Sequence, residues 1–474
     1  MPELSFLNNE SKRFPWIPAL VLYFSSYFMM FFFLNAKFWD DWMLNVQMTS
    51  AEANQYWKSM QAMFPTNRFI EISLLHRNAV AMHLLIFLLH FLNGVLIFAI
   101  LKRFRFIKES AVTAITLIFL VLPINSARVA MVNFRYTYSL TLFLLGWYLL
   151  VQRKFKFLRL LSVGVFIASF IVQSLLVFLI APCIHLFLIN YLDAGISRLK
   201  AFLYSAAIFL VAPCYFVVVR LLDPPASTRA EYFTPSFGGS AKGLFFVLIS
   251  AVWMINELRG LTHQTFFGRK QIISIGVFLI SIGSFAYMAA DNLSSISEWM
   301  LNFVPGRSDW DSRHQLLMGL GLALVVVGFL GEIQSRSKKQ LFSLLLVGCV
   351  GLNFIMMQSY FVDWRKSVGF ISAMSEYRNL SDLDRVMVID TPSAEHFNAR
   401  GRSIRTYEWE AMLSQALGGQ QVKVVNSDQI LCWVPDQIIP QSIIQVSATA
   451  DPKKTVFTGD AGIAVMVIAM NPCQ

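Results

Sequence analysis

The chain has 474 residues, of which 56% are apolar and only 14% are charged, and its formal net charge is +11. Soluble proteins reach about 45–50% apolar residues even when glycine is counted, and about 25% charged residues. A soluble globule of this size could not keep so much apolar surface from water, so we expect most of the chain to lie in lipid. This argues against disordered, collagen-like, disulfide-framework and nucleic-acid-binding proteins, the last because the basic residues lie in short loops between apolar runs.

Eleven apolar runs are long enough, or nearly so, to cross a bilayer core, which takes about 20 helical residues. Those at 111–124, 137–151 and 160–173 are short for a lipid-facing span, so we expect them to be buried, broken or tilted. No small-residue cleavage site follows the first run, which is therefore interpreted as a retained helix. The predicted spans are 15–35, 80–101, 111–124, 137–151, 160–173, 175–193, 201–221, 243–258, 271–290, 314–330 and 340–358.

The basic residues predict the orientation of these spans. With a cytoplasmic N-terminus, the density of Lys and Arg in the inner loops is about three times that in the outer loops, as the positive-inside rule requires. The predicted topology is therefore N-in and C-out. The long outer loops are then 36–79, 125–136, 222–242 and 291–313, so function is expected on the outer face.

The sequence changes character near residue 362. A helix-like stretch beginning at Trp364 is followed by short β-rich runs at 385–390, 422–425, 430–434, 443–448 and 462–470, with a helix expected from Thr406 to Leu417. This pattern predicts a membrane domain over 1–361 and a small α/β or α+β domain over 362–474 on the outer side, where it would shape or cover an active site. Cys432 and Cys473 share this tail and could be two thiols or a disulfide.

The first outer loop carries two adjacent acids, Asp40 and Asp41, a few residues beyond the first helix and between Trp39 and Trp42. Carboxylates so close to the bilayer are costly unless they are hydrated or paired. Burial and a like-charged neighbour would raise the pKa of a carboxyl group, as suits a general base. The alternative is an aromatic belt with solvated acids.

A polar stripe occupies the start of the second span. His76, His83 and His90 are spaced by seven residues and therefore share one helix face, with Asn93 on the same side. This face must look into the bundle or a wet cavity, where it could serve the site or only form interhelical hydrogen bonds. The rings are too far apart along the helix to share one metal ion.

Arginines near the outer helix ends form a third group. Each could extend to lipid phosphates, but several guanidinium groups around an acid pair would bind an anionic headgroup. The group comprises Arg68, Arg77, Arg128, Arg135, Arg220, Arg229, Arg307 and Arg313, the last beside His314.

Together these segments resemble the GT-C superfamily of polytopic glycosyltransferases, which use polyprenyl-phosphate-linked sugars. The matching pieces are FWDDW, the NRF triplet, MHLLIFLLHFLNGVL, the break VLPINSARVAMVNFRYTYSL and a tail after the last helix. The resemblance covers residues 10–160 best. Related proteins often have Asp-Glu and GRP where this chain has Asp-Asp and NRF, which concerns the subfamily more than the reaction class.

The resemblance implies an inverting transfer in which Asp40, rather than Asp41, takes the proton of an acceptor hydroxyl. It implies an undecaprenyl-phosphate sugar as donor, membrane lipid as surroundings, no metal or other cofactor, and a glycan, lipid-linked or protein acceptor. Bacterial O-antigen-modifying glucosyltransferases, which modify lipopolysaccharide precursors, have a similar architecture, so the expected sugar is glucose and the expected location is the inner membrane with a periplasmic active site. The residues expected to bind the donor phosphate are Arg68, Arg128, Arg135, Arg307, Arg313, His83 and His314.

Two other functions remain open at this stage. A transporter or flippase of lipid-linked sugars would tend to show internal repeats and helices broken near the midplane of the bilayer. A glycan polymerase would also place arginine-rich loops outside, but it would not need an acid pair directly after the first helix.

Overall fold

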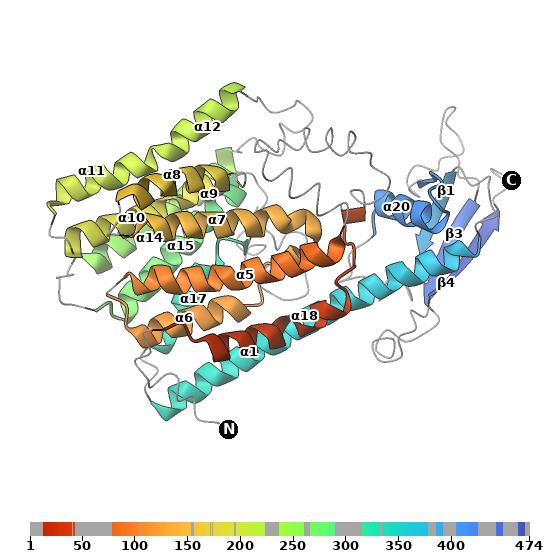
Figure 1. The fold of residues 1–474 in the computed structure, drawn as a ribbon, viewed down its shortest axis with the longest axis horizontal. Coiled ribbons are helices and arrows are strands. Elements are labelled where there is room, and N and C mark those ends of the chain that lie inside the picture. Colours follow the sequence, from red (N-terminus) through yellow and green to blue (C-terminus); the bar gives the residue numbers. More distant parts are fainter. Residues whose placement is uncertain are drawn as a thin grey trace.

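The fold is that of a computed structural model (Figure 1). The structure describes residues 13–39, 41–42, 78–104, 106–152, 156–170, 172, 174–193, 196–222, 237–259, 266–289, 315–331, 335–377, 385–391, 404–424, 442–448 and 463–469. Most of these residues are helical, and a small mixed sheet lies near the C-terminus.

A helix lies at each of the eleven predicted spans. Six helical stretches of the described residues are long and apolar enough to cross a membrane, which indicates a multi-pass membrane protein. The helices are α1 (Trp16–Tyr27), continued by the 3-10 turn η2 (Phe28–Phe32), α5 (Ala79–Lys102), α6 (Glu109–Val121), α7 (Phe134–Leu150), α8 (Lys156–Ser169), α9 (Ser174–Phe178), α10 (Ile180–Leu188), the π turn η6 (Ile189–Asp193), α11 (Arg198–Phe209), α12 (Val211–Leu222), α14 (Phe237–Leu258), α15 (Arg269–Ala289), α17 (Gly319–Leu330) and α18 (Arg336–Ser375).

Two of the predicted spans are each divided into two helices, and proline explains both divisions. A proline inside a helix removes the hydrogen bond to the carbonyl four residues earlier and clashes with it. Pro182 lies four residues after Phe178, where α9 ends, and Pro213 lies four residues after Phe209, where α11 ends. Both breaks therefore follow from the local sequence.

The surface of the bundle is suited to lipid. Large apolar side chains are exposed on its outward faces, such as Ile17 at 78%, Leu160 at 72% and Leu199 at 68% exposure. Polar groups are instead found inside, where His83, Asn93 and Asn353 are fully buried. This reversal of the soluble pattern is what a bilayer solvent requires.

Loops predicted on the inner side lie together. Phe267 of the 259–270 loop donates its backbone N–H to the carbonyl of Phe106 in the 102–110 loop, at 2.6 Å. Arg103 of the 102–110 loop donates to Oε1 of Gln152, at 2.8 Å. We call the end of the bundle at which these basic loops lie the basic end.

Loops predicted on the outer side meet at the other end of α5. Residues 33–39 and 41–42, which we call the acid loop, contact the 125–133 segment through Asp41. The backbone N–H of Asn125 in turn donates to Oε1 of Gln315, at 2.9 Å. Since α5 has 24 residues, the two ends are about 36 Å apart along its axis.

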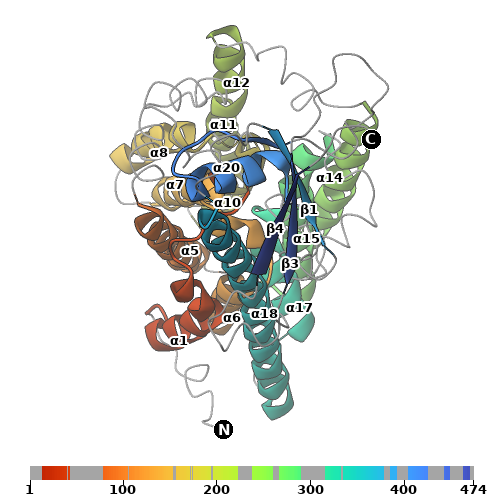
Figure 2. The ribbon, with the colours of Figure 1, turned by 90° about the vertical axis from the view of Figure 1, so that its right-hand side faces the viewer.

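The described part of the tail forms a small mixed sheet with one helix, which we call the tail domain (Figure 2). Its strands are β1 (Arg385–Asp390), β2 (Lys423–Val424), β3 (Ser442–Ala448) and β4 (Ile463–Ala469), in the order β2-β1-β3-β4. β1 pairs in parallel with β2 and β3, and β4 is antiparallel to β3. Helix α20 (Thr406–Ala416) packs against β2 and α18. The predicted strand 430–434 lies outside the described residues.

Helix α18 joins the bundle to the tail domain. It continues without a break across the predicted boundary at 361/362, and its 40 residues make it about 60 Å long, twice the thickness of a bilayer core. Its buried side chains repeat at alternating steps of four and three residues, so one stripe faces the bundle and then the tail domain. The stripe comprises Phe342, Leu346, Cys349, Asn353, Met356, Tyr360, Asp363, Ser367, Phe370 and Met374.

Candidate active site at the acid loop

Asp41 is fully buried and is held by backbone N–H groups. Its Oδ2 accepts from Phe38 and Met131, both at 3.0 Å, and its Oδ1 accepts from Val132 at 2.7 Å. Both carboxylate oxygens are therefore engaged, and they fasten the acid loop to the 125–133 segment. Asp40, the other member of the predicted pair, lies outside the described residues.

The turn before the acid pair has an uncommon backbone. Trp39 has φ +53°, in the left-handed region that few non-glycine residues adopt. Such a conformation persists only where packing enforces it. Trp39 is buried, with its ring centroid 6.0 Å from that of Tyr360 on α18, and the ring of Phe38 lies 5.1 Å from the same tyrosine. Helix α18 thus braces the turn that presents the acids.

His83, on α5, also holds the acid loop in place. It is fully buried near the start of α5, and its Nδ1 lies 2.7 Å from the carbonyl oxygen of Leu34 and 3.0 Å from that of Ala79. Because carbonyl oxygens only accept, the proton must be on Nδ1. The predicted burial of the histidine face is confirmed for His83, His90 and Asn93, whereas His76 lies outside the described residues.

Helix α6 gives way to a short irregular segment that places Arg128. The helix ends at Val121, and Leu122 is extended, as expected before Pro123. Asn125 then adopts φ +52°, which asparagine tolerates well. The 3-10 turns η4 (Ser126–Val129) and η5 (Met131–Asn133) follow. Arg128 and the two backbone donors to Asp41 therefore lie within five consecutive residues.

The guanidinium group of Arg128 is buried, with 6% of the residue exposed. Its Nη1 donates to the carbonyl of Ile124 at 3.2 Å, and its Nη2 donates to the hydroxyl of Tyr27. The group also lies over the Tyr27 ring, 4.6 Å from its centroid. Among the described residues no carboxylate lies within ion-pair distance of this guanidinium group.

Aromatic and amide groups line the bundle below Arg128. His90 contacts the rings of Tyr27 and Phe119, at centroid distances of 6.1 and 5.6 Å. Asn353 of α18 donates to the carbonyl of Val121 at the end of α6, at 2.6 Å. Tyr27 and Tyr360 are not among the predicted site residues, since tyrosines inside apolar runs look like ordinary core residues until their partners are known.

The other predicted phosphate-binding residues are placed only in part. Arg135 is half-buried at the start of α7, with its guanidinium carbon 5.3 Å from the ring centroid of Tyr136. Arg68, Arg307, Arg313 and His314 lie outside the described residues. The structure therefore brings Asp41, His83, Arg128 and Arg135 to one end of the bundle, and the other predicted residues lie outside the described part of the chain.

The tail domain lies directly on the acid loop. Nζ of Lys37 donates to Oε1 of Gln415 in α20 at 3.2 Å, and Trp42 is buried in the core of the tail domain. Burial lowers the pKa of the Lys37 ammonium group, and the neighbouring Asp41 carboxylate partly opposes this shift. The acid loop is therefore enclosed between the bundle and the tail domain.

The chemistry available at this end is that of fixed charges and hydrogen-bond donors. The described residues contain no group of three His, Cys, Asp or Glu side chains placed to hold a metal ion. They do contain a buried guanidinium, that of Arg128, and a buried, hydrogen-bonded carboxylate, that of Asp41, at the same end of the bundle. A guanidinium group there can bind an anion.

Comparison with models of known protein families and with curated proteins finds no match for this chain.

Proposed function

We propose that the protein is an inverting membrane glycosyltransferase of the GT-C type, with eleven spans and an N-in, C-out topology in the bacterial inner membrane. It transfers a sugar from a polyprenyl-phosphate carrier to a glycan or lipid-linked acceptor on the periplasmic side. The catalytic end is the acid-loop end, and the tail domain covers it.

The observation that carries this proposal is the buried Arg128. A guanidinium is charged at every relevant pH, and burying it without a carboxylate partner is costly. Ionisable groups at such positions in membrane proteins mark functional sites. No carboxylate of the described residues pairs with Arg128, so a phosphate carried on lipid is the counter-charge that we propose for it, with the lipid chain among the apolar side chains of the bundle.

The two neighbouring aspartates have different roles in this proposal. Asp41 is the positioning residue, since its oxygens are engaged by backbone donors that fix the loop. Asp40 is the general base, next to a residue whose position is fixed. It accepts the proton of the acceptor hydroxyl while the hydroxyl oxygen forms a bond to the anomeric carbon. The bond from that carbon to the phosphate oxygen breaks, and its electron pair stays on polyprenyl phosphate.

Arg128 and the other outer arginines stabilise the charge that grows on the departing phosphate. Enclosure by the tail domain limits water, which would otherwise compete with the acceptor hydroxyl for the anomeric carbon.

Undecaprenyl phosphate is the test ligand, because the proposed reaction releases it whichever sugar is transferred. We expect it to raise the melting temperature of the purified protein in detergent, whereas uncharged undecaprenol does not. Arg128→Met should remove this stabilisation and Arg128→Lys should retain part of it, since lysine keeps the charge but not the bidentate geometry. Arg198→Gln, at the basic end, is the matched control. Equal stabilisation by undecaprenol would contradict a phosphate site.

Catalysis is tested in proteoliposomes that contain undecaprenyl-phosphate-[14C]glucose and a membrane glycan extract. Asp40→Asn should lower label transfer at least about 100-fold, the scale of general-base catalysis, while donor binding persists. Flipping of the donor without release of undecaprenyl phosphate by the wild-type protein would instead identify a transporter.

A further inference from the structure

Tyr27 lies where the first span changes its helical form. It is the last residue of α1, and the tighter 3-10 turn η2 follows it and leads toward the acid loop. Although it lies in an apolar run, Tyr27 is only 2% exposed, and its hydroxyl group has polar partners from two distant positions of the chain. Buried tyrosine hydroxyl groups usually have such partners, and here one of them is Arg128.

Tyr27 holds the guanidinium group of Arg128 in two ways. Its hydroxyl oxygen accepts a hydrogen bond from Nη2, and its ring faces the group, with the guanidinium carbon 4.6 Å from the ring centroid. The hydrogen bond fixes the direction of one N–H, and the attraction between cation and ring keeps the group close to the ring. The hydrogen bond from Nη1 to the carbonyl of Ile124, at 3.2 Å, completes the support.

These contacts leave donors of Arg128 for a ligand. Arginine has five N–H groups, and the described hydrogen bonds of Arg128 use two of them. A bidentate contact with a phosphate needs two parallel N–H groups that point at two oxygens at once. Such a contact depends on the plane of the guanidinium group, so whatever fixes this plane also contributes to phosphate affinity.

The support of Arg128 comes from regular helices rather than from its own irregular segment. The hydroxyl of Tyr27 donates its hydrogen toward the carbonyl of Leu120 on α6, at 3.4 Å. The ring of Tyr27 lies 4.9 Å from that of Tyr23 on α1 and 6.1 Å from that of His90 on α5. Side chains held by packed helices place a site more precisely than loops do.

We propose that Tyr27 is a positioning residue for the phosphate site of the transferase. It orients the guanidinium group of Arg128 so that two free N–H groups face the phosphate of the polyprenyl carrier, and it keeps that orientation during transfer. This inference rests on the proposed function, because it concerns the same site.

Orientation matters most when the phosphate departs. In the donor the phosphate is a diester with one negative charge, whereas the released monoester carries about 1.5 to 2 charges near neutral pH. A fixed cation stabilises the growing charge more than it stabilises the bound donor. Loss of the orienting hydroxyl should therefore lower kcat more than it raises KM for the donor.

The test compares Tyr27→Phe with Tyr23→Phe in the full-length protein. Tyr27→Phe removes the hydroxyl group that accepts from Arg128 and keeps the aromatic ring. Tyr23 lies four residues earlier on α1, is also 2% exposed, and donates its hydroxyl hydrogen to the carbonyl of Phe87 at 2.7 Å. No described hydrogen bond joins Tyr23 to Arg128, so Tyr23→Phe is the matched control.

Binding of undecaprenyl phosphate is measured by native mass spectrometry in detergent, and donor kinetics are measured in the proteoliposome assay. Tyr27→Phe should weaken undecaprenyl phosphate binding about 10-fold and lower kcat about 10-fold, the scale of one hydrogen bond to a charged group. KM for the donor should change by less than about 3-fold. Tyr23→Phe should stay close to wild type in all three values.

The Arg128→Lys background separates positioning from packing. An ammonium group has no plane to fix, so Tyr27→Phe should weaken undecaprenyl phosphate binding much less in this background than in the wild-type protein. A hydroxyl group that acts only through packing would cost the same in both backgrounds, and this result would overturn the positioning role.

The remaining outcomes separate this inference from the proposed function. Unchanged or tighter binding by Tyr27→Phe would show that the hydroxyl only satisfies Arg128 in the free protein, which overturns the inference and leaves the phosphate site standing. Absence of undecaprenyl phosphate binding in the wild-type protein would overturn the phosphate site and the inference together.

A second variant covers the case in which Tyr27→Phe does not fold. Incorporation of 4-fluorophenylalanine at position 27 fills the volume of the hydroxyl group, but its fluorine is a very poor hydrogen-bond acceptor. The same loss of binding and of kcat is expected, and wild-type values in this variant would overturn the inference.

Discussion

At Asp41, three backbone N–H groups converge on one buried carboxylate. A carboxylate only accepts hydrogen bonds, so the site suits an ionised aspartate and no neutral residue of the same size. Spacing could suggest a functional pair, but two of the groups that hold Asp41, the backbone N–H groups of Met131 and Val132, lie about 90 positions later in the chain.

Replacement of Asp41 by asparagine is predicted to lower stability more than replacement of Asp40. The amide NH2 of the introduced asparagine would face at least one backbone N–H, and leaving a buried donor unsatisfied costs about 1–3 kcal/mol. The expected result is a lower melting temperature in detergent for Asp41→Asn, with Asp40→Asn close to wild type in stability but inactive in transfer. A stable, fully active Asp41→Asn protein would contradict the positioning role.

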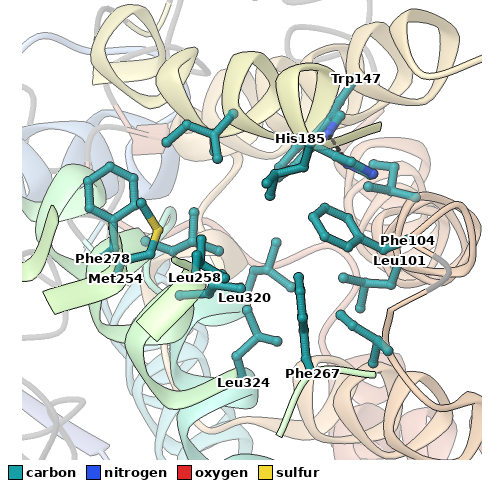
Figure 3. A pocket seen from close by; sticks show the side chains of 17 residues that line it. Leu101, Phe104, Trp147, His185, Met254, Leu258, Phe267, Phe278, Leu320 and Leu324 are labelled. Atoms are coloured by element: carbon teal, nitrogen blue, oxygen red, sulfur yellow. Dashed lines mark hydrogen bonds between the residues drawn. The ribbon is translucent and has the colours of Figure 1, made fainter. Parts of the chain in front are cut away.

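Helices α15 and α17 show what glycine does at the scale of an element. A Cβ at Gly276 would lie 2.7 Å from the carbonyl oxygen of Gly321, and one at Gly321 would lie 2.6 Å from that of Gly276. The backbones are therefore close enough that only glycine fits, as is common where membrane helices pack through small residues. Both helices also contribute side chains to one small apolar cavity, so this contact helps to set the position of its walls (Figure 3).

Gly321→Val is predicted to separate these two helices. Overpacking of a well-packed contact costs about 1–3 kcal/mol, and here the obstacle is backbone, which cannot rotate away. Gly351→Val on α18 is the matched control, because a Cβ there meets nothing within 4 Å. The melting temperature should fall for Gly321→Val only. Similar values for the two variants would show that α15 and α17 can shift without penalty.

In the whole molecule, a buried ion pair connects the bundle to the tail domain. Lys366, on α18, is fully buried and donates to Oδ2 of Asp390 at the end of β1, at 2.5 Å. The ammonium also lies 5.7 Å from the ring centroid of Trp409 in α20. One lysine thus contacts both the sheet and the helix of the tail domain, which fixes that domain over the acid loop.

Asp390→Asn is predicted to loosen the tail domain. It leaves the buried Lys366 ammonium without that carboxylate, and removal of one partner of a buried pair costs about 3–5 kcal/mol. Hydrogen exchange of β1 and α20 should become faster while exchange in α5 and α15 stays unchanged. The double variant Lys366→Met with Asp390→Leu should restore protection, and Lys338→Met, at an exposed lysine of the same helix, should have no effect. Unchanged exchange in Asp390→Asn would show that other contacts hold the domain.

The sequence by itself indicated a multi-pass membrane protein, where its helices lie, and which short runs form the four described strands of the tail sheet. These features follow from composition and from periodicities over a few residues, which the chain carries locally. The continuity of α18 was not predicted, because the last predicted span ends at 358 and the predicted domain boundary lies at 361/362, although no glycine or proline interrupts residues 352–367. Only the tertiary structure decided that Asp41 is held by three backbone N–H groups and that Arg128 is buried with no described carboxylate in ion-pair distance. Those properties depend on contacts between distant segments, and no local pattern encodes them.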